Sequence, residues 1–210
     1  MCTNYRVPDK QLFSEYYGTP APIGEWRDEV YKDYFAPIIR RDGDGPHSDL
    51  ASFGMVPREK IPPAVKLFDT MNARAETVGE KRSFSGAWKK QQLCLIPTQV
   101  FYEPDYETGK AVRWSTGMAD GSPFAIAGLW REWEGEGGTR LSFTMLTLNA
   151  DHHPLMKRFH KPGSEKRSVI IVRTDDYDDW LASRSTDEAR SFVVLPVARS
   201  MNAAPAPKSA

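Results

Sequence analysis

The stretch LCLIPTQVFYE at residues 93–103 decides the class of fold. It is rich in apolar, β-branched and aromatic residues, which favour strands. Similar runs occupy residues 124–133, 141–148, 168–173 and 192–197. The helical patterns are short and lie at residues 10–17, behind a capping Asp9, and at 83–88, 151–160 and 176–182. We therefore predict an α+β fold with a predominantly antiparallel, barrel-like sheet and short helices.

Glycine-rich and proline-rich segments mark the turns and the end of the domain. Residues 18–23 and 41–45 are typical of loops, and the glycine-rich run at 135–138 suits a hairpin between two strands. The last ten residues, MNAAPAPKSA, contain no bulky apolar side chain after Met201. We predict a single domain over residues 1–198 and a disordered tail over residues 199–210.

The composition argues against several classes of protein. The 210 residues include 28 basic and 28 acidic side chains, so no overall field draws the chain onto nucleic acid. No apolar run approaches the roughly 18 residues that a membrane helix needs. The sequence has no GxGxxG or Walker loop and no regular β–α–β alternation, which argues against a Rossmann-type enzyme. Two cysteines without a signal peptide favour the reducing cytoplasm over a disulfide-bonded secreted protein.

Charge is distributed unevenly along the chain. Residues 57–90 contain eight basic and four acidic side chains, a net charge of +4. Residues 175–190 contain two basic and six acidic side chains, a net charge of −4. Both segments are typical of solvated faces, but a basic segment of this kind also suits contact with the phosphates of a nucleic acid.

Cys2 follows the initiator methionine directly. Methionine is usually removed when the next residue is small, and removal would leave Cys2 with a free α-amine beside its thiol. Such a 1,2-aminothiol is a reagent for aldehydes, because the amine forms a Schiff base and the thiol then closes a ring. A cysteine at this position can equally be incidental, so its meaning depends on the residues that accompany it.

Two further segments carry candidate site residues. Asn72, Arg74 and Glu76 alternate in MNARAET, so an extended chain would point all three to one face, although a plain surface loop would also accommodate them. Glu103 ends an apolar strand, where a carboxyl group suits general acid–base chemistry if it lies inside the protein rather than in solvent.

The four histidines are His47, His152, His153 and His160. Their spacing matches neither structural zinc sites nor the HExxH pattern, so we predict no metal and no cofactor. His160 instead suits a proton shuttle. Cys94, between two leucines in the middle of a strand, is predicted to be a buried apolar residue.

Taken together, the chain resembles the SOS response-associated peptidase (SRAP) family of abasic-site processing proteins. The matching stretches, in the family's order, are Met1-Cys2, MNARAET at 71–77, CLIPTQVFYE at 94–103, FAIAGLWREW at 124–133, LSFTMLTLNA at 141–150 and the FHKP that contains His160. The resemblance implies one domain with a distorted β-barrel and flanking helices. It also implies a monomer in the cytoplasm that acts in DNA repair at the nucleoid, needs no cofactor and binds no membrane.

The resemblance further implies a covalent link to abasic sites in single-stranded DNA, formed as a thiazolidine by Cys2, with autopeptidase and lyase-like activity. It assigns Cys2 as the nucleophile, Asn72, Glu103 and His160 as the rest of the catalytic site, and Arg74 as a phosphate contact. Further DNA contacts are expected at Arg6, Phe53, Arg58 and Arg82.

The chain departs from the family pattern at several positions. Thr3-Asn4 replaces Gly-Arg after the cysteine, Phe53-Gly54 replaces Trp-Gly, and Lys161-Pro162-Gly163 replaces Arg-Met-Pro after the histidine. Two other functions fit an exposed N-terminal cysteine or a basic segment. One is an N-terminal-nucleophile amidohydrolase, which would show glutaminase activity, and the other is a module that binds single-stranded DNA without a covalent bond.

Overall fold

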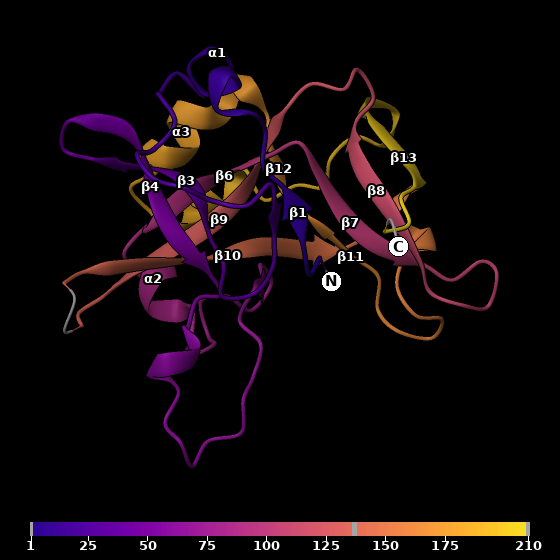
Figure 1. Ribbon diagram of the computed structural model, residues 1–210, viewed down its shortest axis with the longest axis horizontal. Helices are drawn as coiled ribbons and strands as arrows, with labels where there is room; N and C mark the ends of the chain where they lie inside the picture. The colour runs from indigo at the N-terminus through magenta and orange to yellow at the C-terminus, as the bar shows by residue number, and fades with distance from the viewer. Residues whose placement is uncertain (1, 136–137, 209–210) are drawn as a thin grey trace.

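The computed structural model describes residues 2–135 and 138–208, and the strands of this part of the chain form two β-sheets (Figure 1). In this part of the chain the smaller sheet has five strands in the order β13-β8-β7-β1-β2. Its strands are β1 (Tyr5–Arg6), β2 (Glu29–Val30), β7 (Val100–Asp105), β8 (Val112–Met118) and β13 (Met201–Pro205).

The larger sheet has eight strands among the described residues, and its main path runs β11-β10-β4-β3-β6-β9-β12, with β5 paired to β10. An additional β9–β10 pairing joins β10, β4, β3, β6 and β9 into a ring of strands. The strands are β3 (Phe35–Asp42), β4 (Gly45–Phe53), β5 (Asn72–Arg74), β6 (Leu93–Thr98), β9 (Phe124–Trp133), β10 (Arg140–Asn149), β11 (Arg167–Val169) and β12 (Ile171–Val172). Most pairings are antiparallel, whereas β10 runs parallel to both β4 and β5.

The predicted strand at 93–103 divides between the two sheets. β6 pairs with β3 and β9 in the larger sheet, and β7 pairs with β1 and β8 in the smaller one. The change of sheet occurs at Gln99, whose backbone N–H donates to the carbonyl of Arg6 at 2.8 Å. Every residue of β6 is buried, because this strand lies between β3 and β9 in the ring. The apolar stretch therefore supplies the core and also delivers Glu103, in β7, to the second sheet.

Close packing inside the ring requires a glycine on β9. A Cβ atom at Gly128 would lie 2.9 Å from the Sγ of Cys94 and 2.7 Å from the side chain of Ile96. Both distances are too short for a real contact, so a larger residue would force the strands apart. Cys94 is fully buried at this contact, as the sequence predicts.

The helices are short and flank the sheets (Figure 1). They are η1 (Lys10–Leu12), α1 (Phe13–Tyr17), η2 (Arg58–Lys60), α2 (Ser85–Lys89), η3 (Met156–Arg158), η4 (Thr174–Asp176), α3 (Tyr177–Ala182), α4 (Thr186–Ser191) and η5 (Ala198–Ser200). The predicted α+β class with short helices is confirmed. Asp9 occupies the cap position of η1 but its side chain makes no capping hydrogen bond. No helix in the described part of the chain is long and apolar enough to span a membrane.

Three predicted elements differ from the structure. The segment at 151–160 is not a continuous helix, because only Met156–Arg158 form a short 3-10 helix, η3, between turns. The run at 192–197 is not a strand, because after the turn that ends α4 its backbone is irregular, and Val194 and Val197 are more than half exposed. The end of the chain is not a disordered tail throughout, because Met201–Pro205 form β13 against β8. This pairing uses backbone groups, which a segment of small residues supplies as well as any other.

Two hairpins organise the larger sheet. β9 and β10 pair from Trp133 opposite Arg140 to Gly128 opposite Met145, as the glycine-rich run between them predicts. Residues 136–137 of that run lie outside the described residues. The β3–β4 hairpin turns within the predicted loop at 41–45, but its two long strands were not predicted.

Candidate functional site

Glu103 and His160 form a buried pair beside the smaller sheet. The Glu103 Oε2 atom lies 3.0 Å from the His160 Nε2 atom, and their side chains are 1% and 8% exposed. His160 is held by its backbone N–H, which donates to the carbonyl of Pro104 at 2.9 Å. Its φ of +69° is unusual for a residue with a side chain, so the fold maintains this position against a local energetic cost. Glu103 is therefore an interior carboxyl group rather than a strand end in solvent.

Cys2 lies three residues ahead of β1, the strand that pairs with β7. Its Sγ atom contacts the carbonyl of Asn4 at 3.3 Å, and its backbone carbonyl accepts a hydrogen bond from Asn72 Nδ2 at 2.7 Å. Cys2 is 1% exposed. Burial raises the pKa of its thiol, and the negative charge of Glu103 raises that pKa further. The thiol is therefore protonated near neutral pH in this environment.

The structure thus brings together four residues from distant parts of the sequence. Cys2 comes from the chain start, Asn72 from β5, Glu103 from β7 and His160 from the segment after η3. Two of these residues keep buried polar atoms without a hydrogen-bond partner in the described part of the protein, namely Asn72 Oδ1 and His160 Nδ1. Burying a polar atom without a hydrogen bond costs free energy, so such atoms are well placed to bind a reacting group.

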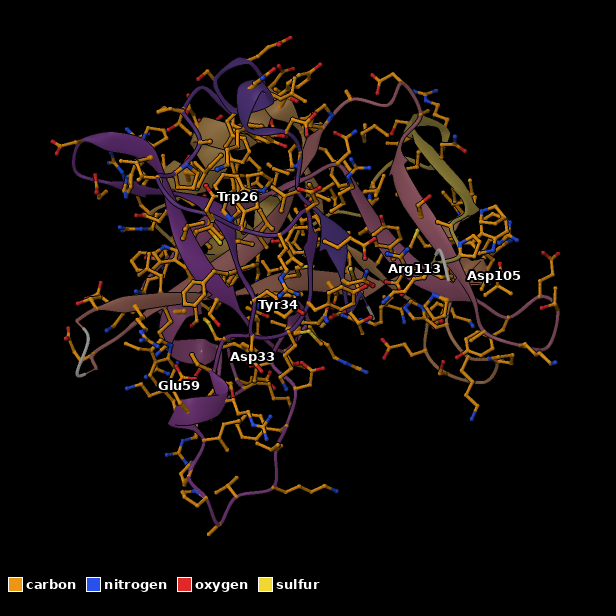
Figure 2. The ribbon with its side chains drawn as sticks, in the orientation of Figure 1. Trp26, Asp33, Tyr34, Glu59, Asp105 and Arg113 are labelled. Carbon is orange, nitrogen blue, oxygen red and sulfur yellow. The ribbon has the colours of Figure 1, made fainter. Side chains whose placement is uncertain are left out.

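Hollows on two sides give access to the pair. Glu103 lines a cavity of about 330 Å³ together with Thr3, Tyr102 and Arg113. His160 lines a cavity of about 550 Å³ with several neighbours, among them Arg158 and Lys166. Both lie toward the side of the molecule that β7 and β8 form, where Figure 2 labels Asp105 and Arg113. The buried pair therefore lies next to two hollows of the surface.

The NARAE segment adopts the alternation that its sequence predicts. Ala73 and Ala75 are buried in the core, whereas Arg74 and Glu76 are exposed on the opposite side. Arg74 Nη1 pairs with Glu165 Oε2 at 2.7 Å and remains 52% exposed, so its guanidinium can also reach a phosphate in solvent.

Arg167 holds the NARAE segment in place through an ion pair with Glu76. It is 2% exposed and pairs with Glu76 at 2.8 Å and with Glu165 at 2.7 Å. Sequence reasoning missed both Arg167 and Glu165. Their alternation in EKR at 165–167, shortly after His160, was the available signal, but it shows no partner until the fold is known.

Arg167→Met is expected to lower the free energy of unfolding by about 2–3 kcal/mol. Loss of one partner from a buried ion pair costs about 3–5 kcal/mol, and the side chains of Glu76 and Glu165 are 37% and 31% exposed, which reduces the cost. Urea unfolding at neutral pH measures this change.

The same variant should respond differently to acid. The hydrogen bond from Arg167 lowers the pKa of Glu165, so the stability it contributes is present above the ordinary glutamate pKa of about 4.3. That contribution is lost as the pH falls through the lowered pKa. The difference in the free energy of unfolding between wild type and variant should therefore become smaller in acid. If the two proteins unfold with the same free energy, or if the difference is the same at every pH, Arg167 does not have this structural role.

The predicted DNA contacts divide into two groups. Arg6, Arg58 and Arg82 are exposed and available to a ligand. Phe53 is not, because it is fully buried and packs against the rings of Phe143 and Tyr5 at 5.1 and 5.6 Å. The prediction that Phe53 contacts DNA is therefore wrong for this structure. Its aromatic ring serves the core of the larger sheet.

The family model described as SOS response associated peptidase (SRAP) matches residues 5–209 of the chain. The chain belongs to the SRAP family. Among curated proteins, it is 29% identical to abasic site processing protein YoqW of Bacillus subtilis, over 71% of this chain and 63% of that protein. It is 31% identical to abasic site processing protein YobE of the same organism, over 60% of this chain and 57% of that protein. The chain thus spans less than two thirds of the length of either relative.

Solved structures share the fold of this chain. A crystal structure of a protein from Bordetella bronchiseptica is 33% identical, has a TM-score of 0.88, and covers 99% of this chain and 100% of that one. A crystal structure from Bacteroides thetaiotaomicron is 20% identical, with a TM-score of 0.73 over 96% of this chain and 90% of that one. The second likeness shows that the fold is shared.

Proposed function

We propose that this SRAP protein captures abasic sites in single-stranded DNA through a covalent bond to Cys2, with Met1 removed. The observation that carries the proposal is the meeting of Cys2, Asn72, Glu103 and His160 in one buried, polar cluster. The names of YoqW and YobE, both abasic site processing proteins, support the same substrate.

The reaction begins with the open-chain aldehyde of the abasic sugar. An α-amine has an ordinary pKa of about 7.7–8.0, so much of it is neutral near physiological pH, unlike lysine at about 10.4. The Cys2 amine attacks the aldehyde carbon, and loss of one water gives a Schiff base. The Cys2 thiol then adds to the same carbon and its proton passes to nitrogen. The product is a five-membered thiazolidine.

The neighbouring side chains have distinct roles in this scheme. Asn72 anchors the Cys2 carbonyl through Nδ2, and its unpaired Oδ1 accepts a hydrogen bond from the amine or from a sugar hydroxyl. The Glu103–His160 pair moves protons at the sugar ring oxygen, which opens the hemiacetal, and at the carbinolamine, whose hydroxyl must leave as water. Arg74 holds a flanking phosphate through its exposed guanidinium.

The proposal is tested with a single-stranded oligonucleotide that contains one abasic site. After incubation with the protein, denaturing electrophoresis should show a heat-stable shifted band. Its mass should equal that of the protein without Met1 plus the DNA, minus one water. Binding without any stable adduct would identify a non-covalent DNA-binding module instead, and glutaminase activity without an adduct would identify an amidohydrolase.

A further inference from the structure

A second polar pocket lies between the segment around α2 and strand β9. Its volume is about 340 Å³, and it is lined by side chains that include Arg82, Ser83, Ser85, Lys90, Gln92 and Arg131. The backbone carbonyl of Gln92 accepts a hydrogen bond from Trp130 at 2.9 Å, which ties the two sides of the pocket together. It shares no lining residue with the cavities beside Glu103 and His160.

The charge of this pocket has one sign. Three of its lining residues, Arg82, Lys90 and Arg131, are cations, and no carboxylate lines it. None of the three forms an ion pair with another described residue. Like charges around one hollow repel one another, and a concave wall concentrates their field, so an anion is the ligand that stabilises the arrangement.

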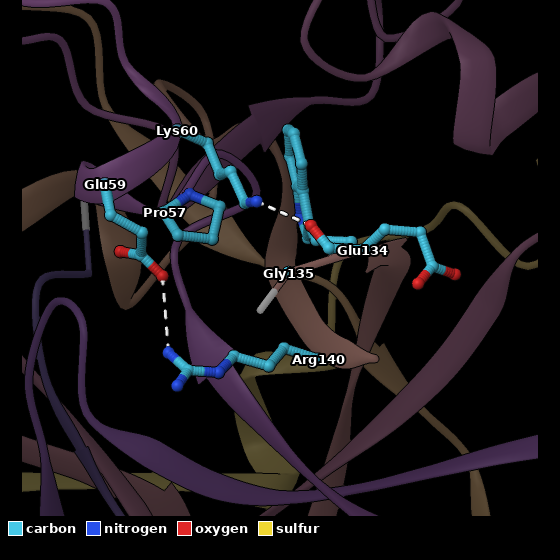
Figure 3. A pocket seen from close by; sticks show the side chains of 7 residues that line it. Pro57, Glu59, Lys60, Glu134, Gly135 and Arg140 are labelled. Carbon is cyan, nitrogen blue, oxygen red and sulfur yellow. Dashed lines mark hydrogen bonds and ion pairs between the residues drawn. The ribbon is translucent and has the colours of Figure 1, made fainter. Parts of the chain in front are cut away.

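A neighbouring pocket shows the opposite arrangement. It lies between η2 and the β9–β10 hairpin and is lined by both acids and bases (Figure 3). There Lys60 Nζ donates to the carbonyl of Glu134 at 2.6 Å, and Glu59 lies 3.7 Å from Arg140. Its cations are already occupied by internal partners. The cations beside α2 lack such carboxylate or carbonyl partners among the described residues, although the Arg131 guanidinium lies over the Trp133 ring at 4.0 Å. The contrast indicates that cations without a neighbouring carboxylate are a specific feature of the pocket beside α2.

The hydrogen-bond donors of the pocket beside α2 suit a tetrahedral oxyanion. Arginine guanidinium groups present paired N–H donors that match two phosphate oxygens, and lysine adds a point charge. The hydroxyl groups of Ser83 and Ser85 and the amide of Gln92 add neutral donors at the same wall. We propose that this pocket binds a phosphate group. If the phosphate belongs to the DNA strand, the pocket extends the proposed function by holding the backbone at a distance from Cys2.

The test compares Lys90→Gln/Arg131→Gln with a control, Arg41→Gln/Arg199→Gln, which removes the same charge from exposed cations elsewhere. Binding of an undamaged single-stranded oligonucleotide is measured against salt concentration. Because undamaged DNA has no aldehyde, failure here is separate from failure of covalent capture by Cys2. The pocket variant should bind roughly 10-fold more weakly, and its slope of log affinity against log salt should fall by about 1.4, or about 0.7 for each phosphate that is no longer neutralised. The control should change both far less.

A second measurement identifies the source of the phosphate. Inorganic phosphate is titrated into the full chain while the amide signals of Gln92 and Arg131 are followed by NMR. Saturable shifts that the pocket variant loses support the site. If DNA binding is then unchanged, a free phosphate compound is the ligand rather than the strand. Weaker DNA binding without such shifts assigns the site to the strand. If neither measurement distinguishes the pocket variant from the control, the proposal is wrong.

Discussion

Cys2→Ser is expected to abolish the heat-stable adduct with abasic DNA, with a loss of yield of about 100-fold or more. The thiol closes the ring on a Schiff base that the same residue has formed, and intramolecular steps of this kind reach effective molarities of about 10⁵–10⁸ M. A serine hydroxyl is a much weaker nucleophile, so the adduct should remain a Schiff base, which hydrolyses on heating. Denaturing electrophoresis with and without borohydride reduction measures both species.

The matched control for this variant is Cys94→Ala. It also removes a thiol, but Cys94 is buried in β6, where it lies opposite Gly128 of β9 and away from the site. It should lose some stability and keep the adduct. A complementary variant that retains a residue ahead of Cys2 keeps the thiol but blocks the amine, and it should also lose the adduct. A stable adduct in either Cys2→Ser or the blocked chain would rule out the thiazolidine.

The fold could be predicted in part because its strongest elements are buried strands. The 93–103 stretch indicated β-structure, but the sequence did not show that it would change sheets at Gln99. The pattern of apolar residues also gave wrong predictions for the end of the chain. The run at 192–197 is apolar yet has an irregular backbone, whereas the small residues of β13 join a sheet because β8 offers free backbone groups. Both outcomes depend on which strand edges remain open, and this is a property of the assembled fold.

The site was easier to anticipate where a residue's chemistry is unusual for its position. Three residues invited a functional explanation, namely Cys2 near the chain start, Glu103 at the end of an apolar strand and His160 late in the chain. The structure brings them together. Phe53 was misassigned because an aromatic side chain suits a base stack and a core equally well. Arg82 and Lys90 belong to the basic segment that was predicted to suit phosphates. Their meeting with Arg131 in one pocket was missed, because Arg131 belongs to a strand far along the chain.

Glu103→Gln should lower the rate of adduct formation by about 10²–10⁴-fold, the usual contribution of a positioned general acid or base. Glutamine keeps the shape of the side chain and its contact with His160 but cannot exchange a proton at the sugar ring oxygen or the carbinolamine. The amine and thiol of Cys2 stay in place, although the variant removes the Glu103 charge, one of the two causes that raise the pKa of the thiol. The variant should therefore reach the same final yield of adduct at long times, and a time course by quenched denaturing electrophoresis separates rate from yield.

Asp105→Asn provides the comparison, because it removes a second buried carboxylate from the same strand. Asp105 is 2% exposed and pairs with Arg158 at 2.7 Å instead of with His160. It should lower the stability of the protein and leave the rate of adduct formation near that of the wild type. If both variants slow the reaction equally, the effect comes from disturbing β7, and Glu103 has no role in proton transfer. A slow Glu103→Gln beside a fast Asp105→Asn assigns the proton transfer to the carboxyl group that faces His160.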